Sequence, residues 1–120
     1  MDVTIRDRSV HTATGGRVNA PTEPAVILVH GAGLDRTIWQ MQTRNIAFQG
    51  RRVYAVDLPG HGRSEGPVLE TVPEMADWLI TFMDAISLDA ATLMGHSMGS
   101  LIVLDAVSYT HLTLPTILLV

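Results

Sequence analysis

The stretch LMGHSMGSLIVL, residues 93–104, determines how the rest of the chain is interpreted. Ser97 stands two residues after Gly95 and two residues before Gly99, with apolar residues on both sides of this group. The pattern predicts a buried strand that turns sharply into a buried helix, with Ser97 at the turn. We expect that helix to start at Ser97, to run through Ala106 and, being apolar nearly all round, to be buried on every side.

So sharp a turn predicts a strained backbone at Ser97 and a hydroxyl that is lifted off the sheet. The residues two before and two after the serine then crowd each other, and Gly95 and Gly99 have no Cβ to collide. The N–H of Met98 lies at the start of the helix, where it is a candidate donor to a developing oxyanion. The alternative is that Ser97 is only a helix N-cap.

Three continuous apolar runs are typical of strands buried on both faces, which belong to parallel sheets. They are Ala25–Val29, Val53–Val56 and Ala91–Met94. Asp35 predicts a helix cap with the helix ending near Gln49, and Thr71 to Glu74 has the form of a capping box. Residues 1–14 predict a hairpin that turns near Asp7 and Arg8. The fold class expected is α/β, a β-hairpin followed by parallel strands with flanking helices.

The first two runs end in loops that bear on function. His30-Gly31-Ala32-Gly33 follows the first run, and the N–H of Ala32 is a candidate second oxyanion donor. The alternative is an ordinary turn, and we expect His30 to be a hydrogen-bonded structural residue and not a base. The second run leads into DLPGHGRSEGP, residues 57–67, whose charged residues Asp57, His61, Arg63 and Glu65 are equally compatible with a plain solvated loop.

Composition narrows the function classes. The 120 residues amount to one domain, 47% of them hydrophobic and 17% charged, which excludes a disordered chain. A net charge of −4 argues against nucleic acid as a partner. The chain has no cysteine, so disulfides and thiolate metal sites are excluded, and we expect no metal and no cofactor. The N-terminus lacks a signal sequence and the apolar runs are too short to cross a bilayer, which predicts a soluble cytoplasmic protein without membrane contact.

Three segments together resemble the α/β-hydrolase superfamily, in its single-domain branch of bacterial esterases, lactonases and carbon–carbon bond hydrolases. They are VILVHGAGLDRTIW, VYAVDLPGHGRSEGP and TLMGHSMGS, within residues 25 to about 106. The resemblance implies that Ser97 is the nucleophile and that Ala32 and Met98 are the oxyanion-hole donors. It also implies a pocket-rimming loop at residues 57–64 and a packing role for Trp39. The motif residues that support these roles are His30, Gly31, Gly33, Gly95, His96 and Gly99.

The resemblance implies cleavage of a carboxylic ester, lactone or related acyl bond in a small molecule, through an acyl-enzyme. Family members that are dehalogenases or epoxide hydrolases use aspartate at the nucleophile position, so Ser97 argues against both.

The base and its acid follow the serine in this family, and only Asp105 and His111 follow it here. Neither fits by position, and we expect His96 to be a pocket-wall or buried residue. We therefore expect an N-terminal part of a hydrolase, truncated after the elbow helix and inactive by itself. The alternative is a non-catalytic ligand-binding or interaction protein of the same fold.

The last residues depart from the family pattern. The stretch VSYTHLTLPTILLV, residues 107–120, resembles a translated sequencing-library adapter at the end of a truncated gene. We expect residues 1–107 to be the hydrolase part and residues 108–120 to be a non-native tail. The alternative is a genuine divergent strand with Ile117–Val120 as its core.

Overall fold

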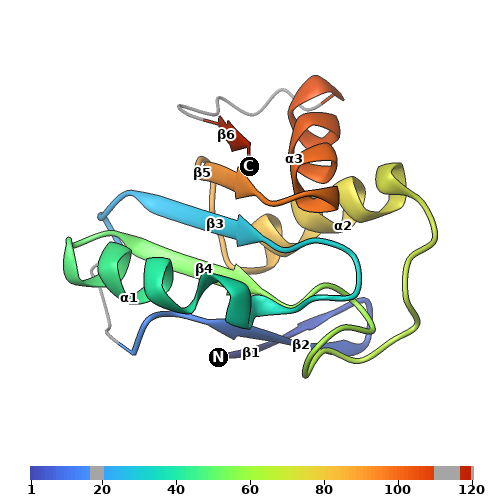
Figure 1. The fold of residues 1–120 in the computed structure, drawn as a ribbon, viewed down its shortest axis with the longest axis horizontal. Coiled ribbons are helices and arrows are strands. Elements are labelled where there is room, and N and C mark those ends of the chain that lie inside the picture. The colour runs from blue at the N-terminus through green and yellow to red at the C-terminus, as the bar shows by residue number, and fades with distance from the viewer. Residues whose placement is uncertain (17–20, 110–116, 120) are drawn as a thin grey trace.

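A single twisted sheet organises the chain. The computed structural model describes residues 1–16, 21–109 and 117–119, and these form six strands in the order β1-β2-β4-β3-β5-β6 (Figure 1). The first two strands form the antiparallel hairpin, and β2 is also antiparallel to β4, whereas the others run parallel. The bounds are β1 (Asp2–Ile5), β2 (Arg8–Ala13), β3 (Ala25–Val29), β4 (Arg52–Val56), β5 (Thr92–Gly95) and β6 (Ile117–Leu119). The predicted hairpin and parallel sheet are confirmed.

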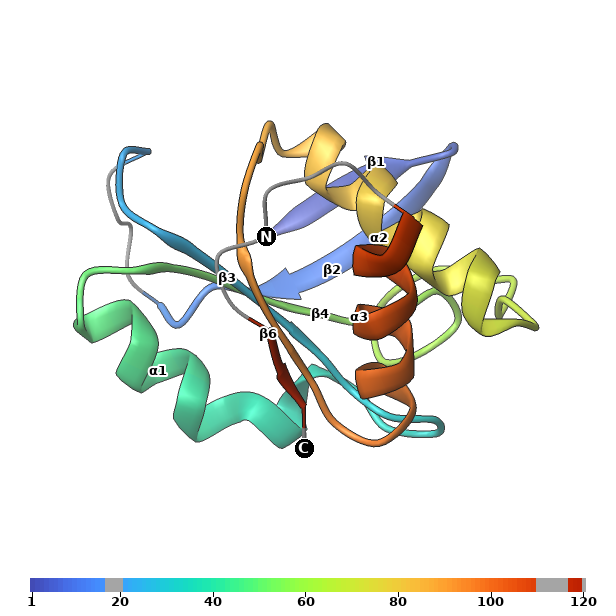
Figure 2. The same cartoon turned by 90° about the horizontal axis from the view of Figure 1, so that it is seen from above.

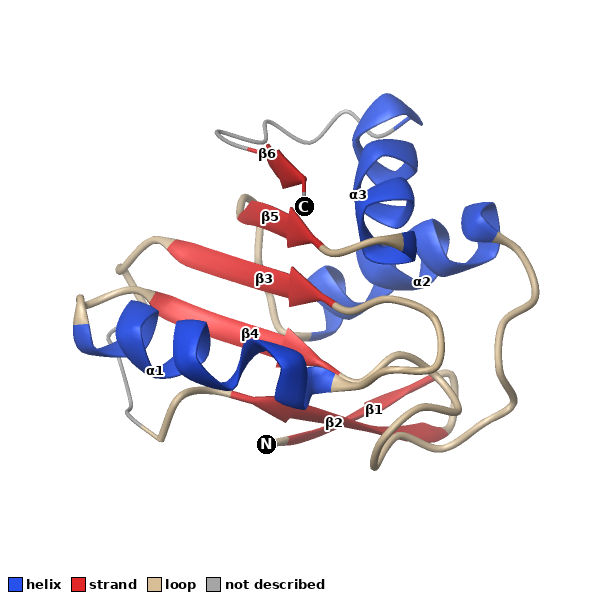
Figure 3. Ribbon diagram, in the orientation of Figure 1, coloured by secondary structure: helices blue, strands red, loops and turns tan. Residues whose placement is uncertain are grey.

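The register of the central strands brings their carboxyl ends to one edge. Val29, the last residue of β3, pairs with Val56 of β4 and with Gly95 of β5. The loops that follow these strands therefore emerge at the same edge of the sheet (Figure 3). All five residues of β3 are buried, as expected for a central strand covered on both faces. Open α/β sheets bind their ligands at this edge.

Helices cover both faces of the sheet. The 3₁₀ turn η1 (Arg36–Trp39) and α1 (Gln40–Phe48) lie on one face, and α2 (Val72–Ala85) and α3 (Met98–Tyr109) lie on the other (Figure 2). The predicted cap is confirmed, because the Asp35 side chain accepts a hydrogen bond from the Thr37 N–H at 2.8 Å. The helix that the sequence predicts from Asp35 to Gln49 thus exists, with a first turn that is 3₁₀.

The predicted capping box begins α2. The Thr71 hydroxyl accepts a hydrogen bond from the Glu74 N–H at 3.2 Å. The apolar face of α2 packs into the core, as its periodicity predicts, although the partly buried Ile86 lies just past its end. Its buried residues are Met75, Ala76, Trp78, Leu79, Phe82 and Met83. Trp78 stacks on Phe82 with ring centroids 5.8 Å apart.

The prediction that α3 is buried on every side is wrong. Ile102, Val103 and Ala106 are fully buried, but Leu101 is 54% and Leu104 47% exposed. The helix packs on α2 and on the sheet with one side, and no element in the described part of the chain covers its other side (Figure 2). The apolar outer side chains of α3 therefore face solvent.

Strand β6 lies within residues 108–120, the predicted non-native tail. It pairs in parallel with β5, from Leu93 opposite Ile117 to Gly95 opposite Leu119. Such pairing is what the alternative of a divergent strand leads one to expect, and the foreign origin of residues 108–120 stays a prediction. Among the described residues, no helix combines the length and the apolar character that crossing a bilayer requires.

Candidate active site

Ser97 occupies the turn between β5 and α3, as its sequence context predicts. Its φ is 56°, in the left-handed region that serine rarely adopts, so the expected strained backbone is confirmed. The turn is closed by the Gly99 N–H donating to the His96 carbonyl and by the Ser100 N–H donating to the Ser97 carbonyl, both at 2.9 Å. Ser97 is exposed, and within the described residues its hydroxyl has no hydrogen-bond partner.

The glycines on either side of Ser97 allow two backbones to meet. A Cβ on Gly95 would lie 2.6 Å from the Ser100 nitrogen and closer still to Gly99, which confirms the predicted crowding. A Cβ on Gly99 would lie 2.8 Å from the carbonyl oxygen of His30 and closer to that of Val29. Real Cβ atoms are not found under 3.0 Å from such neighbours. The start of α3 therefore rests directly on the end of β3.

The loop after β3 runs past Ser97. Gly31 is buried, and a Cβ there would lie 3.2 Å from both the Ser97 Cβ and the His96 carbonyl oxygen. Residues 31–34 form a turn, closed by the Leu34 N–H donating to the Gly31 carbonyl at 3.2 Å, and the φ of 71° at Gly33 is typical of a type II turn. Ala32 holds the second position of this turn, directly after Gly31.

Two backbone N–H groups in these turns have no partner among the described residues, one next to Gly31 and one next to Ser97. Within the described residues, neither the Ala32 N–H nor the Met98 N–H donates a hydrogen bond. The second position of a β-turn leaves its N–H outside the closing bond, and the first residues of a helix have no intrahelical acceptor. The Met98 N–H also lies at the positive end of the α3 dipole.

His30 is a structural residue, as expected. It is fully buried, and its Nε2 accepts a hydrogen bond from the Leu58 N–H at 3.1 Å. The proton is therefore on Nδ1, which lies 2.7 Å from the Gly31 carbonyl oxygen and donates to it. Burial lowers the pKa of His30 below its ordinary value of 6.5, and the nearby His61 acts in the same direction. Both ring nitrogens are occupied, so His30 is not available as a base.

The residues of the loop after β4 are not all solvated. Asp57 is fully buried and accepts hydrogen bonds from Arg36 and from the Arg63 N–H. The alternative of a plain solvated residue is therefore wrong for Asp57, because a buried carboxylate requires such partners. Its main partner, the arginine that begins η1, lies 21 positions earlier in the sequence.

Among the described residues, no hydrogen bond or ion pair joins His11, His61 or His96 to Ser97. His96 is exposed, so it is not a buried residue, and its expected place in a pocket wall stays a prediction. His11 pairs with Asp2 at 2.7 Å in the hairpin, and the Nδ1 of His61 lies 3.1 Å from the Pro59 carbonyl oxygen. His111 lies outside the described residues.

Two further residues complete the account of the site. Asp105 is on α3, and one of its carboxylate oxygens is buried without a hydrogen-bond partner in the described part of the chain. Trp39 is buried between α1 and the sheet, in agreement with its expected packing role. No group of three His, Asp or Glu side chains suited to a metal ion occurs among residues 1–16, 21–109 and 117–119.

Comparison with known families decides what this arrangement represents. The model of the alpha/beta hydrolase fold matches residues 24–111, which contain the three segments identified above. The chain belongs to the α/β-hydrolase fold family.

Two curated proteins are identical to this chain at about a third of the aligned positions. It is 33% identical over 78 residues to an (E)-2-((N-methylformamido)methylene)succinate hydrolase of Acinetobacter baylyi, covering 64% of this chain and 29% of that protein. It is 34% identical over 106 residues to an epoxide hydrolase of Caballeronia sordidicola, covering 82% and 32%. The chain therefore spans less than a third of the length of these relatives.

Solved structures share the fold over nearly the whole chain. A bacterial membrane phospholipase A aligns with a TM-score of 0.90 at 26% identity, covering 99% of this chain and 38% of that one. The enol-lactonase of Burkholderia xenovorans LB400 aligns with a TM-score of 0.85 over 98% of this chain and 45% of that one. At 21% identity, the second likeness shows the fold alone.

Proposed function

We propose that this chain is part of a serine hydrolase that cleaves a carboxylic ester, lactone or related acyl bond of a small molecule through an acyl-enzyme. One observation supports the proposal above the others. Ser97 presents its hydroxyl from a strained turn, and among the described residues this hydroxyl and the backbone N–H groups of Met98 and Ala32 have no partner. Unpaired N–H groups beside a nucleophile are the donors that a developing oxyanion needs.

The proposed reaction has two steps. The Ser97 Oγ bonds to the substrate carbonyl carbon, its proton passes to a base, and the carbonyl oxygen becomes an oxyanion held by the N–H groups of Ala32 and Met98. Collapse of this intermediate breaks the bond between the carbonyl carbon and the leaving oxygen, which takes the proton from the base; an ester releases an alcohol, and a lactone keeps the new hydroxyl on the opened acyl chain. Water then attacks the acyl-enzyme in the same manner and releases the acid.

The base and its acid are proposed to come from outside these 120 residues. His30 has both nitrogens engaged, and His11 is paired with Asp2 away from Ser97. The curated relatives are more than three times as long as the matched part of this chain, so they have ample room for later residues. Without a base the Ser97 hydroxyl stays protonated near neutral pH and is a weak nucleophile. The chain by itself is therefore proposed to be inactive.

The resemblance to an epoxide hydrolase does not change this choice of reaction. The family pattern implies aspartate as the nucleophile of that reaction, whereas this chain has a serine at the elbow. A serine ester formed with a carbonyl substrate is the intermediate that this nucleophile favours.

Hydrolysis of p-nitrophenyl acetate tests the proposal. The protein made from the complete reading frame should show turnover that the Ser97→Ala variant loses, because the acyl-enzyme can no longer form. The 120-residue chain should be no faster than its own Ser97→Ala variant. Equal rates for the full-length protein and its alanine variant would refute the serine mechanism, and Ser97-dependent turnover by the 120 residues would refute an external base.

A further inference from the structure

We infer that Asp57 is a positioning residue for the oxyanion hole, an inference that rests on the proposed function. Its buried carboxylate joins the loop after β3, which contains Ala32, to the loop after β4. The oxyanion donor on Ala32 is thereby held in place from a neighbouring strand end and not only by its own turn.

Three donors converge on the two oxygens of Asp57. Oδ1 accepts from the backbone N–H of Arg36 at 2.7 Å. Oδ2 accepts from the Arg36 guanidinium at 2.7 Å and from the backbone N–H of Arg63 at 2.9 Å. The carboxylate is fully buried and the Arg36 side chain is only 16% exposed. A buried, charge-assisted set of this kind is strong and geometrically restrictive.

The loop after β4 is folded around this carboxylate. Gly62 has a φ of 53°, and a Cβ on it would lie 2.6 Å from Oδ1 of Asp57 and closer to the other carboxylate atoms. The Ser64 hydroxyl donates to the Asp57 carbonyl oxygen at 2.7 Å. The loop thus packs closely around Asp57, so the carboxylate has little freedom to follow a displaced η1.

A second link, through His30, joins the same two loops. The Leu58 N–H, one residue after Asp57, donates to His30 Nε2, and His30 Nδ1 donates to the Gly31 carbonyl. That carbonyl also closes the turn that contains Ala32. Residues 30–36 are consequently attached to the β4 loop at both ends, by His30 at the start and by Arg36 at the end. Ala32 lies between the two attachments.

The position of an oxyanion donor affects rate more than substrate binding. The donor interacts most strongly with charge that develops only in the transition state. Removing one donor from an oxyanion hole lowers kcat by roughly 10²–10³-fold. Displacing the donor by a fraction of an ångström loses part of the same rate acceleration. We expect a loss of kcat of about 10-fold to 100-fold when the Asp57 contacts are broken, with KM little changed.

Asp57→Asn is the sharpest perturbation. The amide NH₂ replaces one oxygen and, in either orientation, faces at least one of the donors from Arg36 or Arg63. Asp84→Asn is the matched control, since it makes the same chemical change at an exposed position on α2.

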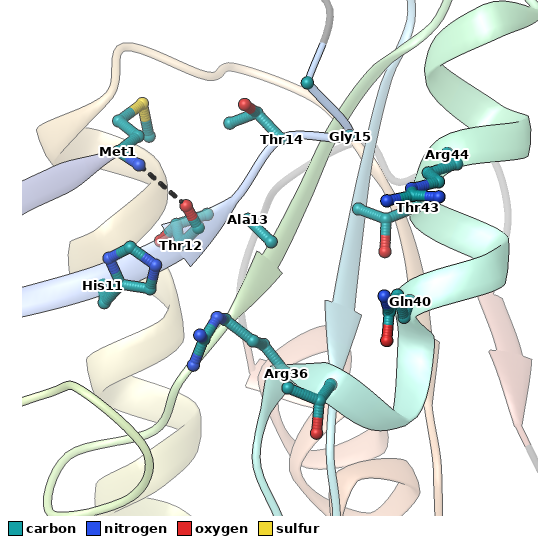
Figure 4. Close-up of a pocket in the computed structure, with 12 residues that line it drawn as sticks. Met1, His11, Thr12, Ala13, Thr14, Gly15, Arg36, Gln40, Thr43 and Arg44 are labelled. Carbon is teal, nitrogen blue, oxygen red and sulfur yellow. Dashed lines mark hydrogen bonds between the residues drawn. The ribbon is translucent and has the colours of Figure 1, made fainter.

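Arg44→Ala is the control for arginine loss. Arg44 lines the same cavity of about 410 Å³ as Arg36, but Arg36 extends from η1 toward β2 and His11 whereas Arg44 lies farther along α1 (Figure 4).

The experiment measures kcat and KM of the full-length protein with p-nitrophenyl acetate, in folded samples checked by circular dichroism. Asp57→Asn should lower kcat about 10-fold to 100-fold with KM within about 3-fold, and both controls should match wild type. If Asp57→Asn fails to fold, Arg36→Lys replaces it, because both backbone bonds to Asp57 survive and only the guanidinium contact is lost. A kcat equal to that of the controls in a folded variant would overturn the inference.

A second readout separates this inference from the proposed function. In ¹⁵N-labelled protein without substrate, the Ala32 amide resonance should shift in Asp57→Asn and stay in place in Asp84→Asn. Wild-type protein without Ser97-dependent turnover would refute the serine mechanism, yet the shift of Ala32 would still report on the link through Asp57. An unmoved Ala32 resonance would overturn the positioning role even if the enzyme is active.

Discussion

Replacing Gly99 with alanine is expected to destabilise the fold severely. The added methyl group would lie 2.8 Å from the His30 carbonyl oxygen and closer to that of Val29. Both are backbone atoms at the end of β3, so no rotation of a side chain relieves the contact. Either α3 or β3 has to move, and the strand end also carries the loop with Ala32.

The magnitude follows from two opposing effects. Gly99 is the second residue of α3, where exchanging glycine for alanine favours the helix by up to about 1 kcal/mol. Overpacking against a fixed neighbour lowers the free energy of unfolding by about 1–3 kcal/mol. We expect a loss at or above the upper end of this range where the new Cβ meets backbone atoms at less than 3 Å. The free energy of unfolding should therefore fall by about 2 kcal/mol or more, which is a large part of the 5–15 kcal/mol typical of a domain.

Urea unfolding followed by tryptophan fluorescence measures this loss. Trp39 and Trp78 are buried in the core clusters on opposite faces of the sheet, so the signal reports on both layers. With a slope of about 1–3 kcal/mol per M, the midpoint should fall by about 1 M or more. Gly16→Ala is the matched control, since a Cβ there has no neighbour within 4 Å and only the positive φ is penalised. A Gly99→Ala midpoint equal to wild type would refute the close contact between α3 and β3.

Three further outcomes are expected. Ser97→Gly should be more stable toward urea than Ser97→Ala by about 1 kcal/mol, because glycine tolerates the positive φ at this position, and equal midpoints would contradict the strained turn. Because burial lowers the pKa of His30, the unfolded state binds more protons than the folded one below pH 6.5, so stability falls with falling pH. The His30→Gln variant should lose less stability than wild type between about pH 7.5 and pH 5.5, and equal losses would assign the effect to other groups. Resequencing the source DNA with a different library preparation should give other codons after residue 107, and the same codons in the same frame would contradict a foreign tail.

Much of the fold was predictable because the strands and helix caps follow from residues that are close together in the sequence. The apolar runs at residues 25–29, 53–56 and 91–94 match β3, β4 and β5 to within one residue at each end. Their continuity reflects central places in the sheet, with β3 buried at every residue, and Thr71 and Asp35 cap helices through bonds within a few residues. The strained turn at Ser97 was likewise predictable, because its causes lie within five residues.

Features that depend on distant partners were not predictable. Nothing near Asp57 in the sequence shows that Arg36, on another segment, pairs with it in the interior, so a plain solvated residue stayed open as an alternative. The apolar composition of α3 predicted burial on all sides, whereas the exposure of Leu101 depends on which elements pack against it. For the same reason, the sequence alone did not place His96 on the surface.

Covalent labelling of Ser97 is the most direct test of the account. The full-length protein is treated with a fluorophosphonate probe, digested, and analysed by mass spectrometry to locate the modified residue. The account predicts a single adduct on Ser97 that is absent from Ser97→Ala and that forms more slowly in Asp57→Asn. An adduct on another residue, or none on a folded protein that hydrolyses p-nitrophenyl acetate, would contradict the assignment of Ser97 as the nucleophile.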